Sequence, residues 1–106
     1  MEEIILGTEA KIRLVIEPIN GKSPYELDGW KVELYTNPKK KVIVSKDDCS
    51  AIENDANAFY VPFDSSEVGV GDLNADVVVY VPDETFKKDR LRTEIARIES
   101  IATIIP

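Results

Sequence analysis

The stretch DLNADVVVYV, residues 72–81, has the most regular hydrophobic alternation in this chain. Apolar side chains occupy every second position, while Asp72, Asn74 and Asp76 fall on the opposite face. A period of two places alternate side chains on opposite faces of an extended strand. The segment therefore predicts a long β-strand with one face in a hydrophobic core.

Shorter segments of the same kind recur along the chain. We expect strands at 8–17, 30–36, 39–45 and 58–63, with a short one around Ala51–Ile52 and a loop at 64–71. The lysines at 39–41 suit an edge strand, because charge there discourages unwanted pairing. Pro62 cannot donate a ladder hydrogen bond, so its strand is expected to be bulged there or to lie at an edge.

Short strands at intervals of roughly ten residues, with turn signals between them, predict an all-β sandwich or barrel. The chain has 106 residues, and no repeat or linker divides it, so we expect residues 1–106 to form one domain. Trp30 is similar to the buried tryptophan of immunoglobulin-like sandwiches. The paired cysteines of true immunoglobulins are absent, and Leu73 stands at the position of their corner tyrosine.

The last sixteen residues, LRTEIARIESIATIIP, fit two periods. Apolar residues recur at helical spacing, which favours a helix. The many isoleucines and threonines are β-branched and favour a pleated strand. The residues alone leave the two alternatives balanced. The β-branched content, together with the family resemblance given below, leads us to expect strand, broken near Glu99–Ser100.

Charge is unevenly distributed along the chain, whose net charge is −7. Residues 47–86 contain ten Asp and Glu and no Lys or Arg. An acidic middle argues against a nucleic-acid partner, because such partners need a basic surface. It is compatible with a solubilising face or with a basic protein partner. The lysines at 39–41 could bind an acidic partner, but a solvated edge is the simpler interpretation.

The composition also limits chemistry and location. No apolar run is long enough to span a membrane, and the acidic start MEEIILGTEAK lacks the apolar core of a signal peptide. We therefore expect a cytoplasmic product. Cys49 is the only cysteine and there is no histidine, which removes an internal disulfide and the commonest general base and metal ligand. We expect no enzymatic activity, no catalytic residues and no cofactor.

Two acidic groups are candidate cation sites. Asp72, Asn74 and Asp76 match the first half of a calcium-loop pattern, but Val77 and Asp83 replace its glycine and its final glutamate. A strand would hold the three in a row about 7 Å apart, which cannot wrap around an ion. A looser group consists of Asp47, Asp48, Glu53 and Asp55. We assign a metal to neither group.

Three further features resemble parts of catalytic or phosphate sites. Ser65 and Ser66 have no histidine partner and no lysine close in sequence, so they are expected only to begin a loop. Cys49 follows two aspartates, which disfavour a thiolate, so it is expected to be a partly buried structural residue. The glycines of GVGDLN, 69–74, precede a strand instead of opening a helix, so we interpret them as turn residues.

A carbohydrate- or cation-binding sandwich is the alternative function. Carbohydrate binding calls for an exposed aromatic platform, and Tyr25, Tyr35 and Tyr80 are the tyrosines expected to be free to supply one. No two of them are close in sequence. A small-molecule ligand is therefore not expected.

The C-terminal half carries a series of short motifs: Val81-Pro82-Asp83, Phe86, the step from Asp89 to Glu94, and the apolar run Ile101 to Ile105. Gly7-Thr8, VELYTNPKKKVIV and GVG precede them. Together these motifs resemble a family of small immunoglobulin-like proteins encoded in phage-like and mobile-element clusters of gut-associated bacteria. One departure is Arg90, which stands where that family has a turn glycine.

The resemblance implies an immunoglobulin-like β-sandwich of about seven or eight strands, with a turn around Asp89. Similar domains open the upper baseplate and tail-fibre proteins of phages. It therefore implies a non-enzymatic structural or adaptor protein of a tail- or baseplate-like assembly, present in a virion-like particle. The implied partners are other protein subunits and further copies of this chain. It implies no functional residues, since the family has no catalytic motif.

Overall fold

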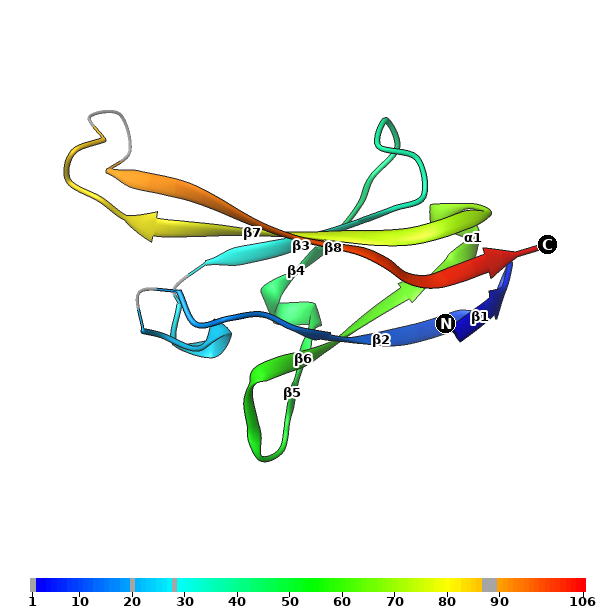
Figure 1. Cartoon of the computed structure of the whole chain (residues 1–106), viewed down its shortest axis with the longest axis horizontal. Coiled ribbons are helices and arrows are strands. Elements are labelled where there is room, and N and C mark those ends of the chain that lie inside the picture. Colours follow the sequence, from blue (N-terminus) through cyan, green and yellow to red (C-terminus); the bar gives the residue numbers. More distant parts are fainter. Residues whose placement is uncertain (1, 20, 28, 87–89) are drawn as a thin grey trace.

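A computed structural model describes residues 2–19, 21–27, 29–86 and 90–106 (Figure 1). The described residues form eight strands. They are β1 (Glu2–Ile5), β2 (Glu9–Val15), β3 (Trp30–Tyr35), β4 (Val42–Ser45), β5 (Ser50–Ile52), β6 (Asp55–Asp64), β7 (Gly71–Pro82) and β8 (Leu91–Ile105). Short helical turns occur at η1 (Pro24–Glu26), η2 (Lys46–Asp48) and α1 (Ser65–Val68).

The strands form two sheets that face each other. A five-stranded sheet has the order β1-β8-β7-β3-β4, and a three-stranded sheet has the order β2-β6-β5. In the seven-stranded immunoglobulin sandwich the second, fourth and fifth strands share one sheet and the third, sixth and seventh share the other, and the same grouping appears here when β4 is counted as an added strand beside the third. The expected all-β, immunoglobulin-like sandwich is confirmed. The described ladders are antiparallel, except that β1 runs parallel to β8.

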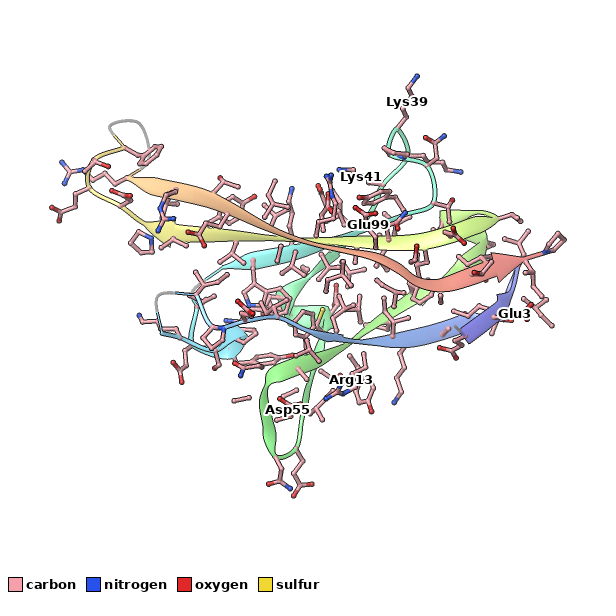
Figure 2. All side chains as sticks on the ribbon, viewed as in Figure 1. Glu3, Arg13, Lys39, Lys41, Asp55 and Glu99 are labelled. Carbon is pink, nitrogen blue, oxygen red and sulfur yellow. The ribbon has the colours of Figure 1, made fainter. Side chains whose placement is uncertain are left out.

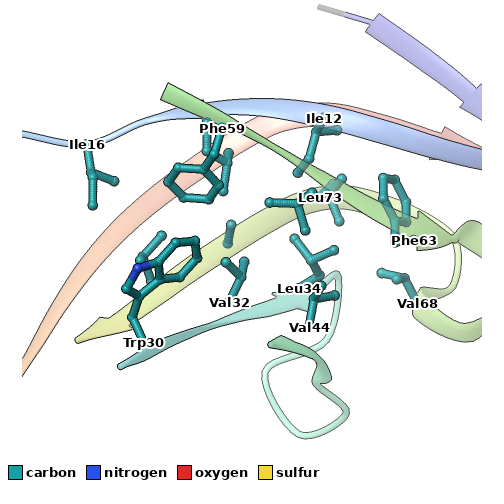
Figure 3. Close-up of a cluster of buried hydrophobic side chains, with 14 of the residues drawn as sticks. Ile12, Ile16, Trp30, Val32, Leu34, Val44, Phe59, Phe63, Val68 and Leu73 are labelled. Atoms are coloured by element: carbon teal, nitrogen blue, oxygen red, sulfur yellow. The ribbon is translucent and has the colours of Figure 1, made fainter. Parts of the chain in front are cut away.

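The core lies between the sheets, where the alternating apolar side chains of both layers meet (Figure 3). Trp30 packs against Phe59 with ring centroids 4.7 Å apart, and Tyr25 meets the Trp30 ring edge-on at 5.9 Å. The Trp30 indole N–H donates to the Pro24 carbonyl oxygen at 2.7 Å. Since a buried indole N–H needs a partner, this bond allows Trp30 to lie in the core, as expected.

The strand that contains Pro62 differs from the prediction. β6 is the central strand of its sheet, and its register with β2 runs regularly through the pair Pro62–Lys11. Pro62 is tolerated because β5 pairs with β6 only as far as Tyr60. The nitrogen of Pro62 cannot donate to β2, so it faces the side on which β5 has already ended.

The C-terminal segment is a strand, β8, as expected. Its predicted break near Glu99–Ser100 is a bulge, because the register with β7 shifts between Leu73 and Ala75. Ser100 has a φ of 51°, in the left-handed region, and its N–H donates to the Asn74 side-chain oxygen at 2.9 Å. The bulge therefore has its own hydrogen-bond support.

Other boundaries differ from the predictions in smaller ways. β1 was not predicted, and α1 lies within the segment expected to be a loop. β4 is at an edge, as expected, but begins only after the lysines at 39–41. The turn expected around Asp89 lies outside the described residues. None of the helices described is long and apolar enough to cross a membrane.

Candidate functional site

The candidate site is the outer edge of β8, which is covered along only part of its length. β1 pairs with Ala102–Ile105 at the C-terminal end of β8 (Figure 1). Within the described part of the chain, residues 91–98 pair with β7 on one side and with no strand on the other. This segment, which we call the open edge, is therefore available for hydrogen bonding to another strand.

The backbone groups at the open edge can be assigned a direction. Tyr80 stands opposite Thr93, and its N–H donates to the Gly29 carbonyl at 3.3 Å, on the β3 side of β7. In an antiparallel pair, the backbone N–H and C=O groups of two opposite residues either point towards each other or both point away from each other. The N–H and C=O of Thr93 therefore point away from β7, in the plane of the sheet and towards its uncovered side. Pro82, opposite Leu91, agrees, because a proline could not fill a hydrogen-bonded pair.

The side chains of the open edge alternate between two surfaces. Leu91 and Ile95 are 44% and 58% exposed on the outer face of the five-stranded sheet. Arg92 and Glu94 stand opposite core-facing valines of β7, so they lie on the inner face. There Arg92 pairs with Glu94 and with Asp83, the latter at 3.4 Å. The edge thus presents apolar side chains outside and opposite charges inside.

A cleft of about 490 Å³ lies along this edge, between β8 and the end of β2. One wall is the segment 15–19, which follows the end of β2, and the other is the segment 94–98 of β8. Val15 and Ile95 are the exposed apolar residues in these walls. The cleft therefore separates the two sheets at a point where, among the described residues, β2 and β8 each have a partner strand on one side only.

A buried ion network holds the open edge against the rest of its sheet. Asp76 is 1% exposed, and Arg97 of β8 binds both of its oxygens, at 2.9 and 3.1 Å. Lys41 and the Tyr35 hydroxyl donate to the same carboxylate at 3.3 and 3.2 Å. These hydrogen bonds, that of Arg97 first, hold the pKa of Asp76 below its usual value despite burial.

The calcium-like row Asp72, Asn74 and Asp76 does not form a cation site. The three residues lie along one face of β7, as expected from a strand. Asp72 accepts from the Thr103 hydroxyl at 3.2 Å, and Asn74 supports the bulge at Ser100. The side chains of Asp72, Asn74 and Asp76 therefore bind groups of β8 and join the two strands.

The second acidic group is also dispersed. Asp55 pairs with Arg13 at 2.6 Å on the three-stranded sheet (Figure 2), and Asp48 accepts from the Ser45 hydroxyl at 3.1 Å. Within the described residues, no group of three or more His, Cys, Asp or Glu is arranged to hold a metal ion. The structure thus does not bring Asp47, Asp48, Glu53 and Asp55 together as ligands.

The candidate nucleophiles have structural surroundings. Ser65 is buried; its hydroxyl accepts from the Gly7 N–H at 2.9 Å and donates to the Ile5 carbonyl at 3.3 Å, so it fixes the β1–β2 turn. Ser66 donates to Asp64 at the start of α1. Cys49 is half-buried, and burial, followed by the nearby Asp48 charge, raises its thiol pKa to about 11. A thiolate is therefore disfavoured, as expected.

The three tyrosines considered for an aromatic platform do not form one. Tyr25 packs in the core, and Tyr35 is buried beneath the ion network, so the expectation that both are free was wrong. Tyr80 is 36% exposed on the outer face of β7. A hollow of about 650 Å³ lies over β2 and β6, with Phe63 as the aromatic residue in its lining. These surfaces offer no stacked aromatic pair for a sugar ring.

Comparisons with protein-family models, with curated proteins and with solved structures found no match for this chain. The site is therefore interpreted from its own geometry, without a matched relative. The open edge was missed from the sequence because the order of the strands and the short reach of β1, which was not predicted, decide which part of β8 is uncovered. Its signal was nevertheless present: two apolar residues, Leu91 and Ile95, flank the opposite charges of Arg92 and Glu94.

Proposed function

We propose that this protein is a non-enzymatic structural adaptor that joins protein subunits of a phage tail- or baseplate-like assembly. The observation that supports this proposal is the open edge of β8, residues 91–98, with its outward N–H and C=O groups. An exposed edge of this kind binds an extended segment of another protein by adding a strand to the sheet.

The surroundings of the edge favour a protein partner. Leu91 and Ile95 give side-chain contacts outside the sheet, while the cleft beside Glu94 and Ala96 can take side chains on the inside. Alternate side chains of an added strand would thus meet both surfaces. The assignment to a phage-like assembly comes from the resemblance of the C-terminal motifs described above.

Fractionation of particles tests this proposal. In cells that carry the encoding cluster, the protein should sediment with tail-like particles in a sucrose gradient, as followed with an antibody. Its gene should also lie beside tail, portal or capsid genes. Sedimentation only with small soluble proteins, in cells that produce intact particles, would contradict the proposal.

A matched pair of variants tests whether the open edge is used. Thr93→Pro removes an outward N–H that the β7 ladder does not use, whereas Thr93→Val keeps it. Because strand addition needs that donor, we expect Thr93→Pro to leave the particle fraction and Thr93→Val to remain there. Equal retention of both variants would show that another surface makes the contact.

A further inference from the structure

We propose that two copies of this chain pair antiparallel through their open edges, with Thr93 at the two-fold axis. This inference deepens the proposed function, on which it rests, by naming a second copy as a partner for the same edge. The pairing would join two five-stranded sheets into one continuous sheet. The reason for choosing a second copy is that the edge is complementary to itself.

The direction of the backbone groups allows this register. The N–H and C=O of Thr93 point away from β7, so two copies of Thr93 can exchange both hydrogen bonds across the axis. By alternation along the strand, the groups of Leu91 and Ile95 point the same way. In this register Leu91 of one copy stands opposite Ile95 of the other, and these residues also form a hydrogen-bonded pair.

The side chains match in the same register. Leu91 and Ile95 are exposed on the outer face, so two apolar cross-strand pairs form there. Arg92 of each copy stands opposite Glu94 of the other on the inner face. These are non-hydrogen-bonded positions, where opposite side chains come closest. Two apolar pairs and two ion pairs thus flank the axis.

Neighbouring registers lose this complementarity. A shift of the axis to Arg92 places like charges opposite each other, and a shift to Glu94 does the same. An axis at Ile95 sets Arg92 against Ile98 and Glu94 against Ala96, so neither charge gains a partner from the other copy and each keeps only its contacts within its own chain. Inward-pointing charges usually protect an edge from pairing. Here they favour the register with Thr93 at the axis, in which both charges of each copy face an opposite charge.

The positions of β1 and Arg97 are compatible with the pairing. β1 covers β8 only from Ala102 onwards, beyond the paired segment. Arg97 is held on the outer face by Asp76, so its charge is already paired within each copy. A single strand pair is a small interface, so the dimer is expected to be weak, with a dissociation constant on the order of micromolar to millimolar.

Sedimentation velocity over a concentration series tests the pairing, with the charge-reversal variants Arg92→Glu and Glu94→Arg. Each variant alone places like charges opposite each other twice, so we expect each to dimerise roughly tenfold more weakly or worse. An equimolar mixture pairs two acidic side chains with two basic ones. The mixture should therefore associate at least as well as the wild type, at a concentration where each variant alone is monomeric.

The controls separate this register from general charge effects. Lys39→Glu and Glu53→Arg change the net charge by the same amounts at exposed sites away from the edge, and should dimerise like the wild type. Thr93→Pro should be monomeric and Thr93→Val dimeric. That pair also decides the question if a charge variant does not fold, which circular dichroism and the melting temperature would reveal.

Each result counts for or against the pairing. Loss of association in both single variants with recovery in the mixture would support it. A wild type that stays monomeric through millimolar concentration, an unaffected Arg92→Glu variant, or a mixture that fails to associate would overturn it. Since these measurements use the purified protein, their failure would leave the particle-fraction result for Thr93→Pro unchanged, so the two proposals can fail separately.

Discussion

Asp76 is a buried acidic residue that binds basic side chains from two distant parts of the sequence. Its carboxylate is bound by Arg97 from β8, by Lys41 before β4 and by Tyr35 from β3. The acidic middle of the sequence and its basic flanks thus meet partly within one chain. The same holds for the pairs Arg13–Asp55 and Arg92–Asp83.

Replacement of Asp76 by Asn should destabilise the protein in a pH-dependent way. At pH 7 we expect the free energy of unfolding to fall by about 1–3 kcal/mol, because a buried acceptor of three donors loses its charge. The folded-state pKa of Asp76 is below 3.8, so its stabilisation is full above that value and is lost as pH falls through the folded pKa. Urea unfolding at pH 7 and at pH 3 measures the difference.

The control is Asp47→Asn, at an exposed site on the same protein. It should change the free energy of unfolding by less than about 0.5 kcal/mol at either pH. A deficit in Asp76→Asn that was the same at pH 3 as at pH 7 would mean that the lost stability came from packing and not from the carboxylate charge.

Cys49 should react slowly with thiol reagents in the folded protein. Its thiol pKa is about 11, raised by burial from the usual 9.0. At pH 8 the thiolate is therefore roughly a hundredfold scarcer than in the unfolded chain. Labelling with Ellman's reagent, with and without urea, measures this ratio. In a Cys49→Ser background, Ser50→Cys places a thiol at an exposed neighbour and should react quickly in both states.

At the scale of elements, the residue just before β8 has a backbone conformation that its side chain does not favour. Arg90 has a φ of 54°, in the left-handed region that glycine adopts most easily. Arg90→Gly should raise the free energy of unfolding by about 0.5–1 kcal/mol, because glycine adopts this region without steric cost. Thermal or urea unfolding checks the change. Lys40→Gly, at an exposed turn site without a left-handed φ, should give no gain.

Amide exchange should alternate along the open edge. The N–H groups of Arg92, Glu94 and Ala96 point towards β7 and should exchange slowly. Those of Thr93 and Ile95 point out of the sheet and should exchange faster at concentrations at which the protein is monomeric. Hydrogen-exchange NMR resolves the two sets. Uniform protection in the dilute protein would mean that another segment covers this edge.

The sequence predicted the elements that alternate over many residues. β2, β3 and β7 have long runs with one buried face, so their period was decisive. β1 was missed because only Ile4 of its residues is buried, which leaves no period to detect. In β8 the apparent helical spacing arose because Leu91 and Ile95 face outwards whereas Ile98 and Ala102 face inwards. The apolar residues that fit one helical stripe therefore lie on the two opposite faces of a strand.

The prediction for Pro62 was wrong for a different reason. A proline indicates a missing partner on one side, but the sequence does not say how far the neighbouring strand extends. The partners of Asp76 were equally beyond a local reading, since Tyr35 and Arg97 are 41 and 21 residues away from it. Residue type predicted that these groups lack or need hydrogen-bond partners. The order of the strands decided which groups lie close enough to bind each other.

At the scale of the whole molecule, the open edge exists because β1 is short. β1 reaches only the last four positions of β8, from Ala102 to Ile105. The two ends of the chain therefore lie side by side, while the far end of the β7–β8 pair extends away from them (Figure 1). The same arrangement pairs the first strand with the last and leaves the other half of β8 without a neighbouring strand on that side among the described residues.

The parallel pairing of β1 and β8 also sets how the protein bears mechanical load. Force applied to the two ends pulls β1 and β8 in opposite directions along their common axis, so the hydrogen bonds between Glu2–Ile5 and Ala102–Ile105 are sheared together. Force applied through Val70 and the C-terminus instead separates β7 from β8 one bond at a time, because those strands are antiparallel. Single-molecule stretching should therefore record a higher unfolding force end to end than through a Val70→Cys attachment in a Cys49→Ser background. Equal forces would show that the terminal pair carries no load; a higher end-to-end force would make this sandwich a tension-bearing link between whatever is joined to its two ends.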